Sequence, residues 1–222
     1  MVAFRDVVGL FDPDCDALAE LAVIEPDRPR TRLNDGKVGP DGAFWVGTMD
    51  DSGSPREPLG TLYRVHPSGT VEPKVSGLRV SNGLAFAADG RTMFHADTGG
   101  PWIDRWDFDP ATGAIANRTR IVTTGRPDGA ATDEEGGYWS ADVGAARLNR
   151  YNRAGDLIAA YDVPVAAPTM PCFGGRDLRT LFVTSLRTGR PASLLDRYPL
   201  TGITLAAPSP VAGAPVGLFR DR

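Results

Sequence analysis

Turn-forming residue pairs recur along this chain at nearly constant intervals, with short strand-like segments between them. Successive turns lie 48, 46 and 42 residues apart, and an aromatic residue follows each one at a similar distance. The turns are Asp41-Gly42, Asp89-Gly90, Glu135-Gly136 and the related segment at Asp177. A period of about 40 to 50 residues indicates one supersecondary unit that is stacked several times.

A second, independent set of segments has the same period. Each contains an arginine within a short strand-like run, and these arginines lie 41, 45 and 47 residues apart. They are Arg64 (strand 62–65), Arg105 (104–108), Arg150 (148–151) and Arg197 (196–200). Units of this length that hold four strands each are typical of β-propeller blades. We therefore predict an all-β chain that forms a single domain over residues 1–222.

The predicted blades account for most of the chain. Four units fit between about residues 34 and 210, and the segment before them has room for one or two strands. Residues 12–25 show some helical periodicity, but prolines bracket them and we expect a turn followed by a strand. The aromatic residues that follow the turns are expected to pack between blades; they are Trp45, Phe94, Trp139 and Phe182.

Composition excludes several classes of function. The net charge is -4 and no basic stripe occurs, which argues against nucleic-acid binding. No run approaches the roughly 18 apolar residues of a membrane-spanning helix, and no signal-peptide core follows the N-terminus. The two cysteines, Cys15 and Cys172, lie far apart, so a disulfide framework is not expected and a reducing cytoplasm is the default location.

Three polar residues occupy one position of the repeat. Asn34, Asn82 and Asp128 each precede a hairpin turn by seven residues, at the entrance to the innermost strand of a blade. That position faces the mouth of a propeller's central channel, so the three side chains should converge into a binding site. Each alone would more often be a turn residue. The shared register favours a site, because each blade already has a hairpin turn seven residues later.

The residue types indicate which ligand such a site would hold. Carboxylate and carboxamide oxygens without histidine or cysteine suit a hard cation such as Ca²⁺, Mg²⁺ or Mn²⁺, and Zn²⁺ can also be accepted. His66 and His95 lie elsewhere in the repeat and are expected to be structural. No GxSxG, P-loop or GxGxxG motif occurs.

Four segments together resemble the family of gluconolactonase, regucalcin (senescence marker protein) and luciferin-regenerating enzyme. They are RLNDGKVGPDGAFWVGTM (32–49), SNGLAFAADGRTMFHADT (81–98), RPDGAATDEEGGYW (126–139) and PTMPCFGGRDLRTLFVTS (168–185). The resemblance implies a six-bladed β-propeller that hydrolyses sugar lactones or related esters with one divalent metal ion, Ca²⁺ or Zn²⁺. It implies that Asn82 and Asp128 bind the metal, and that Arg32 and Asn34 bind substrate hydroxyls.

The chain departs from the family pattern at its start. Family members begin about a blade and a half earlier, and a third metal ligand, a glutamate in an E-G-P context, lies in that part. Neither Glu20 nor Glu25 has this context. We therefore expect a ring that lacks its first blade and a half, either from a shortened gene model or from divergence.

The leading functional hypothesis is metal-dependent lactone hydrolysis at the channel mouth. In it Asp128 also accepts a proton from the attacking water, which makes it the candidate catalytic residue. The main alternative is a calcium-binding propeller or pseudoenzyme without turnover, and a third is a nonfunctional fragment. The partner would be a small sugar lactone, while the exact lactone, the metal in the cell and the oligomeric state stay open.

Overall fold

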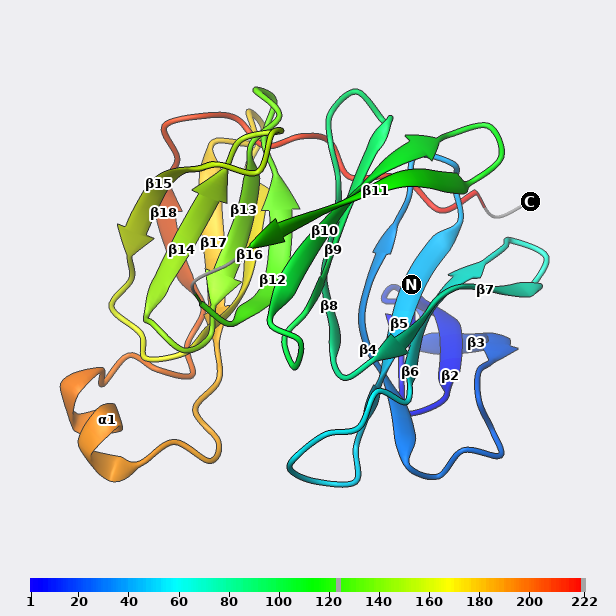
Figure 1. Cartoon of the computed structure of the whole chain (residues 1–222), viewed down its shortest axis with the longest axis horizontal. Coiled ribbons are helices and arrows are strands. Elements are labelled where there is room, and N and C mark those ends of the chain that lie inside the picture. The colour runs from blue at the N-terminus through cyan, green and yellow to red at the C-terminus, as the bar shows by residue number, and fades with distance from the viewer. Residues whose placement is uncertain (123–124, 221–222) are drawn as a thin grey trace.

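The computed structural model describes residues 1–122 and 125–220, which form five antiparallel sheets (Figure 1). The first strand of each four-stranded sheet lies nearest the central channel of the propeller. In each sheet, hydrogen-bonded neighbours are consecutive along the chain. The first sheet holds β1 (Val2–Ala3), β2 (Val7–Asp12) and β3 (Ala17–Val23), and the second holds β4 (Thr31–Val38), β5 (Phe44–Asp50), β6 (Gly60–Val65) and β7 (Val71–Leu78). The third holds β8 (Ser81–Phe86), β9 (Thr92–Asp97), β10 (Trp102–Asp109) and β11 (Ala114–Val122), and the fourth holds β12 (Pro127–Thr132), β13 (Tyr138–Asp142), β14 (Arg147–Tyr151) and β15 (Leu157–Asp162). The fifth holds β16 (Pro168–Gly174), β17 (Thr180–Ser185) and β18 (Leu205–Pro208). This is a β-propeller, as the repeat predicts.

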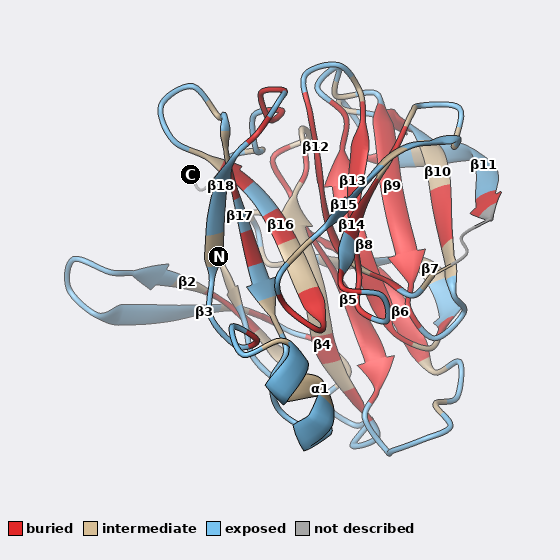
Figure 2. Cartoon of the chain, turned by 90° about the vertical axis from the view of Figure 1, so that its left-hand side faces the viewer, coloured by how far each residue is buried: buried red, intermediate tan, exposed pale blue. Residues whose placement is uncertain are grey.

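Burial is greatest in the inner strands of the middle sheets and least at the outer edges. Strands β8, β9 and β13 are buried along their whole length, whereas the outermost strand β15 is almost entirely exposed (Figure 2). The apolar clusters lie between successive sheets, because each sheet packs one face on its neighbour. Trp45 packs against Phe86 and Phe108 of the next sheet, and Trp139 packs against Phe173.

The described residues form five sheets, three of four strands and two of three, rather than the six blades that the resemblance implies for a whole family member. The structure corrects two expectations. Arg197 is not in a strand: it ends the short helix α1 (Ala192–Arg197), and β18 is the third strand of that sheet. Phe182 does not pack between blades. Its side chain is 37% exposed because no other described sheet covers that face of β17.

The expected turn and strand in residues 12–25 are present as β3 and the turn before it. Among the described residues, no helix is long and apolar enough to cross a membrane.

The recurring arginines have a physical role in two of the sheets. In each, a buried aspartate at the hairpin turn accepts hydrogen bonds from the indole N–H of the tryptophan and from the arginine Nε. The two sets are Asp41, Trp45 and Arg64, and Asp133, Trp139 and Arg150; the Nε–carboxylate distance is 2.7 Å in both. The aspartate therefore fixes the tryptophan that packs on the next sheet.

The segment after β18 joins sheets that are far apart in sequence. The Ala214 N–H donates to Thr132 O at 2.9 Å, and the Arg220 N–H donates to Gly42 O at 3.2 Å. Between them, Gly217 lies so close to Val38 O and Gly39 O that an added Cβ would approach both to 2.6 Å. The segment thus runs from the fourth sheet to the second, across the end of the channel opposite the mouth described below.

His95 is buried in β9, and it predicts how stability depends on pH. Its Nε2 lies 2.8 Å from Ser81 Oγ, and burial lowers its pKa from 6.5 to about 3. Below pH 6.5 His95 becomes protonated in the unfolded chain, whereas in the folded protein it stays neutral down to about pH 3. Stability should therefore fall by about 2 kcal/mol at pH 5 relative to pH 8 from this group alone.

The free energy of unfolding in urea is measured for the wild type and for His95→Gln at several pH values. Both proteins share the contribution of the carboxylates, so the difference between them reports on His95. We expect the wild type to lose more stability than the variant between pH 7 and pH 5. Parallel pH profiles would show that His95 is not the group responsible.

Candidate functional site

The side chains at the channel mouth are positioned by irregularities of the innermost strands. The pairing register shifts between Leu33 and Gly36 in β4, between Asn82 and Ala85 in β8, and between Pro127 and Ala130 in β12. A bulge bends a strand and redirects the side chains beside it. Asn34, Asn82 and Asp128 each lie at one of these bulges, so the same local feature turns all three toward the channel.

Hydrogen bonds running in one direction connect three sheets at this mouth. Arg32 Nη1 donates to Asn34 Oδ1 (3.3 Å), and Asn34 Nδ2 donates to Asn82 Oδ1 (2.9 Å). Asn82 Nδ2 donates in turn to Thr98 Oγ1 (2.7 Å), whose hydroxyl donates to Pro127 O (2.5 Å). The chain of donors fixes the amide orientation of both asparagines, and it leaves Asn82 Oδ1 one free lone pair.

Asp128 is the carboxylate of this mouth, and its surroundings disfavour negative charge. Burial raises its pKa to about 7, and the charge of Asp35 adds to the shift. The charges of Arg126 and Arg190 and the N–H of Gly129 act in the opposite direction. No described side chain forms an ion pair with Asp128. A carboxylate in this position is stabilised by a bound cation.

Asp35 and Lys37 lie deeper in the channel. Asp35 Oδ2 accepts the Leu84 N–H at 3.1 Å, and Lys37 Nζ donates to Ala130 O at 2.7 Å. Burial raises the pKa of Asp35, and the charge of Lys37 opposes this shift; burial likewise lowers the pKa of Lys37, against the charge of Asp35. The two groups therefore balance each other's charge inside the channel.

All four residues predicted from the sequence line one cavity of about 410 Å³ at the channel mouth: Arg32, Asn34, Asn82 and Asp128. Sequence reasoning missed Asp35 and three further arginines of the lining, Arg56, Arg126 and Arg190. Asp35 and Arg126 lie inside motifs already singled out, RLND and RPDG, so the motifs could have revealed them. Arg56 and Arg190 lie in non-repeating loops that offer no such signal.

The acidic residues considered as substitutes for the family's glutamate lie outside this cavity. Glu20 is exposed on β3, and Glu25 accepts a hydrogen bond from Tyr63 Oη at 2.7 Å. Asp51 is not part of the lining either, but it holds Arg32 through an ion pair of 3.1 Å. His66 and His95 are also absent from the lining.

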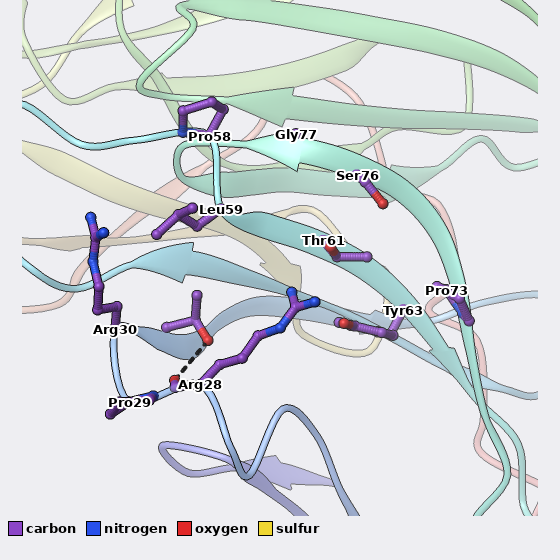
Figure 3. A pocket seen from close by; sticks show the side chains of 11 residues that line it. Arg28, Pro29, Arg30, Pro58, Leu59, Thr61, Tyr63, Pro73, Ser76 and Gly77 are labelled. Atoms are coloured by element: carbon purple, nitrogen blue, oxygen red, sulfur yellow. Dashed lines mark hydrogen bonds between the residues drawn. The ribbon is translucent and has the colours of Figure 1, made fainter.

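A larger cavity, of about 750 Å³, lies away from the channel beside β6 and β7 (Figure 3). Arg28, Arg30 and Tyr63 line it together with prolines and small side chains. Arg30 is already paired with Glu57 at 3.0 Å, and no carboxylate or carboxamide side chain belongs to the lining. This cavity therefore lacks the side-chain oxygen donors that line the channel mouth, and we do not place the functional site in it.

The residues at the mouth fit a hard divalent cation. Asn82 Oδ1 and the Asp128 carboxylate are oxygen donors, and both belong to the same cavity. Within the described part of the chain, no three histidine, cysteine, aspartate or glutamate side chains gather as a metal cluster. Any cation held here would therefore rest on these two donors, with other oxygens completing its coordination.

Comparisons of the sequence with known proteins all point to one family. The family described as "SMP-30/Gluconolactonase/LRE-like region" matches residues 1–187. The 6-deoxy-6-sulfogluconolactonase of Pseudomonas putida is 36% identical over 99% of this chain and 76% of its own length. Rabbit (Oryctolagus cuniculus) regucalcin is 32% identical over 84% of this chain, which matches 65% of that protein.

A solved structure is similar along nearly the whole chain. It is that of a regucalcin from Agrobacterium tumefaciens, described as a calcium-binding protein. The TM-score is 0.91 at 31% identity, over 98% of this chain and 75% of the other.

Proposed function

Because this chain belongs to the SMP-30/gluconolactonase/LRE-like family, we propose that it hydrolyses a sugar lactone at the channel mouth with the help of one divalent metal ion. The observation that carries the proposal is that Arg32, Asn34, Asn82 and Asp128 line one cavity. The last three lie at matching bulges of three inner strands. The names of its relatives, among them a sulfogluconolactonase, support a lactone as the substrate. The chain spans 65% of the rabbit regucalcin, so the activity of the whole protein is part of the proposal.

Asp128 and Asn82 would hold the metal ion. When bound, the ion polarises the lactone carbonyl and lowers the pKa of a bound water. Asp128 would accept a proton from the attacking water, because its carboxylate lines the same cavity as the other proposed site residues and forms no ion pair with a described side chain.

The hydrogen bonds that Asn34 makes within the protein determine which of its atoms can bind substrate. Both of its amide hydrogens are used, by Ser81 O and by Asn82 Oδ1. Only Asn34 Oδ1 retains a free lone pair, so a substrate hydroxyl must donate to it. Arg32 supplies donors beside it, and its ion pair with Asp51 holds the guanidinium in place. The pair thereby orients the sugar ring.

Titration with metal and lactone together tests the proposal. Acid release from D-glucono-1,5-lactone is followed at constant pH while Ca²⁺, Zn²⁺, Mg²⁺ or Mn²⁺ is added to metal-free protein. We expect release above the spontaneous rate that depends on metal and stops when EDTA is added. Metal binding without such release would instead support the calcium-binding propeller without turnover. Neither binding nor release would support the nonfunctional fragment.

Thr98 should affect the metal site without touching the ion. Its hydroxyl is the acceptor that fixes the Asn82 amide, so Thr98→Val should free this amide to turn. Loss of such an outer hydrogen bond lowers metal affinity about 10-fold or more. Calorimetric titration measures the affinity, and Thr112→Val, in a surface turn, is the control. Equal affinities in Thr98→Val and the wild type would remove Thr98 from the site.

The finer features of the protein belong to the same proposal. We propose from the family that the whole protein forms a six-bladed ring, that the ion is Ca²⁺ or Zn²⁺, and that residues 1–222 belong to one propeller domain. A cytoplasmic location is supported by the two cysteines, both of which are free.

A further inference from the structure

The channel mouth carries more positive charge than its carboxylates require. Four arginines line the cavity, Arg32, Arg56, Arg126 and Arg190, against two aspartates, Asp35 and Asp128. Lys37 already balances Asp35 deeper in the channel. A metal ion bound by Asp128 would make the excess larger. The arginines therefore need a separate explanation.

Two of the four arginines already have acceptors within the protein. Arg32 forms its ion pair with Asp51, and Arg56 Nε donates to Asp50 O at 3.0 Å. Arg126 and Arg190 differ, because neither forms an ion pair within the part of the chain that the structure describes. Both line the cavity, and their charges oppose the rise in the pKa of Asp128.

One atom of the Arg190 guanidinium lacks an acceptor. Its Nε is buried and makes no hydrogen bond among the described residues. A buried donor left without an acceptor is costly, and such groups are rare in native proteins. The residue lies just before α1, in a segment that extends from the same end of the molecule as the loop between β5 and β6, which carries Arg56 (Figure 1). These two loops form the rim of the mouth.

We propose that Arg126 and Arg190 bind an oxyanion group of the substrate, so that the preferred substrate is a sugar lactone with an anionic substituent. Phosphate, sulfonate and carboxylate share the necessary chemistry, since each offers oxygens that a guanidinium can bind in pairs. The cationic rim also attracts such substrates from solution. This inference rests on the proposed lactonase function.

The test separates substrate choice from turnover. Binding of 6-phosphogluconate and of gluconate to metal-free protein is measured by calorimetry, so that phosphate cannot be held by a cation. The wild type should bind 6-phosphogluconate about 10- to 100-fold more tightly than gluconate, the range expected for hydrogen bonds to a charged group. Rising salt should reduce this ratio. Equal affinities for the two acids would overturn the proposal.

Two variants locate the effect. Arg190→Gln and Arg126→Gln should each bring the ratio of the two affinities close to one. Arg197→Gln removes a charge from the same segment, but Arg197 is exposed and outside the cavity, so the ratio should stay as in the wild type. An equal effect of Arg197→Gln and Arg190→Gln would attribute the preference to overall charge and overturn the assignment.

Kinetics distinguish this proposal from the proposed function. With 6-phosphogluconolactone and gluconolactone as substrates, Arg190→Gln should lower the ratio of their kcat/KM values by about 10-fold or more, mainly through KM. If neither lactone is hydrolysed, the lactonase proposal fails, while the affinity ratio still decides whether the oxyanion site exists.

Discussion

Asp128→Asn is expected to abolish metal-dependent lactone hydrolysis, with kcat/KM falling about 10³-fold or more. The substitution preserves shape but removes the only carboxylate among the three residues of the shared register. It removes a metal ligand and the acceptor of the water's proton together. Acid release from gluconolactone at saturating metal measures the activity, and calorimetry measures the loss of metal affinity.

A matched control is Asp162→Asn, because the Asp162 side chain is 90% exposed and lies on the outermost strand β15. It should retain wild-type activity and metal affinity. Full metal-dependent turnover in Asp128→Asn would remove Asp128 from the catalytic role.

The second large effect concerns stability. Asp133→Ala should lower the free energy of unfolding by about 3 to 5 kcal/mol, the cost of breaking a buried ion pair. Asp133 is fully buried, and its carboxylate accepts hydrogen bonds from Arg150 Nε and Trp139 Nε1, both at 2.7 Å. Its loss leaves the Arg150 Nε–H and the Trp139 indole N–H without their acceptor, although Arg150 keeps its second pair with Glu135. Urea unfolding followed by tryptophan fluorescence measures the change.

Glu135→Gln provides the comparison within the same cluster. Glu135 also pairs with Arg150 at 2.7 Å, but its side chain is 59% exposed. The expected change is at most about 1 kcal/mol, as for other surface ion pairs. Similar losses in the two variants would mean that burial of Asp133 is not what makes it important.

The repeat made the inner part of the molecule predictable. Inner strands recur with the same turn, so Asn34, Asn82 and Asp128 could be placed together from their spacing alone. Asp35 was not predicted, because the residues at the same position of the repeat in β8 and β12 are glycines, Gly83 and Gly129. Gly83 has a φ of +59°, and an added Cβ would meet Tyr138 Oη at 2.5 Å. Only β4 places a carboxylate at this depth among the three strands.

Features outside the repeat could not be found in this way. The arginine spacing pointed to a strand at Arg197, but this residue ends the helix α1, where no ladder constrains it. Arg190 lies in the same segment, and its importance depends on a loop path that the spacing does not encode. Arg56 likewise reaches the cavity from a loop.

The segment that crosses the far end of the channel has a consequence for the order of folding. Each sheet pairs only strands that are consecutive along the chain, so the sheets can form one after another as the ribosome releases them. The bonds from Ala214 to Thr132 and from Arg220 to Gly42 span 82 and 178 residues, and they cannot form until the residues of every described strand have been synthesised. Residues 212–220 thus join the second and fourth sheets late in folding. Mutations there should slow the docking of these sheets on each other while leaving the formation of each sheet unchanged.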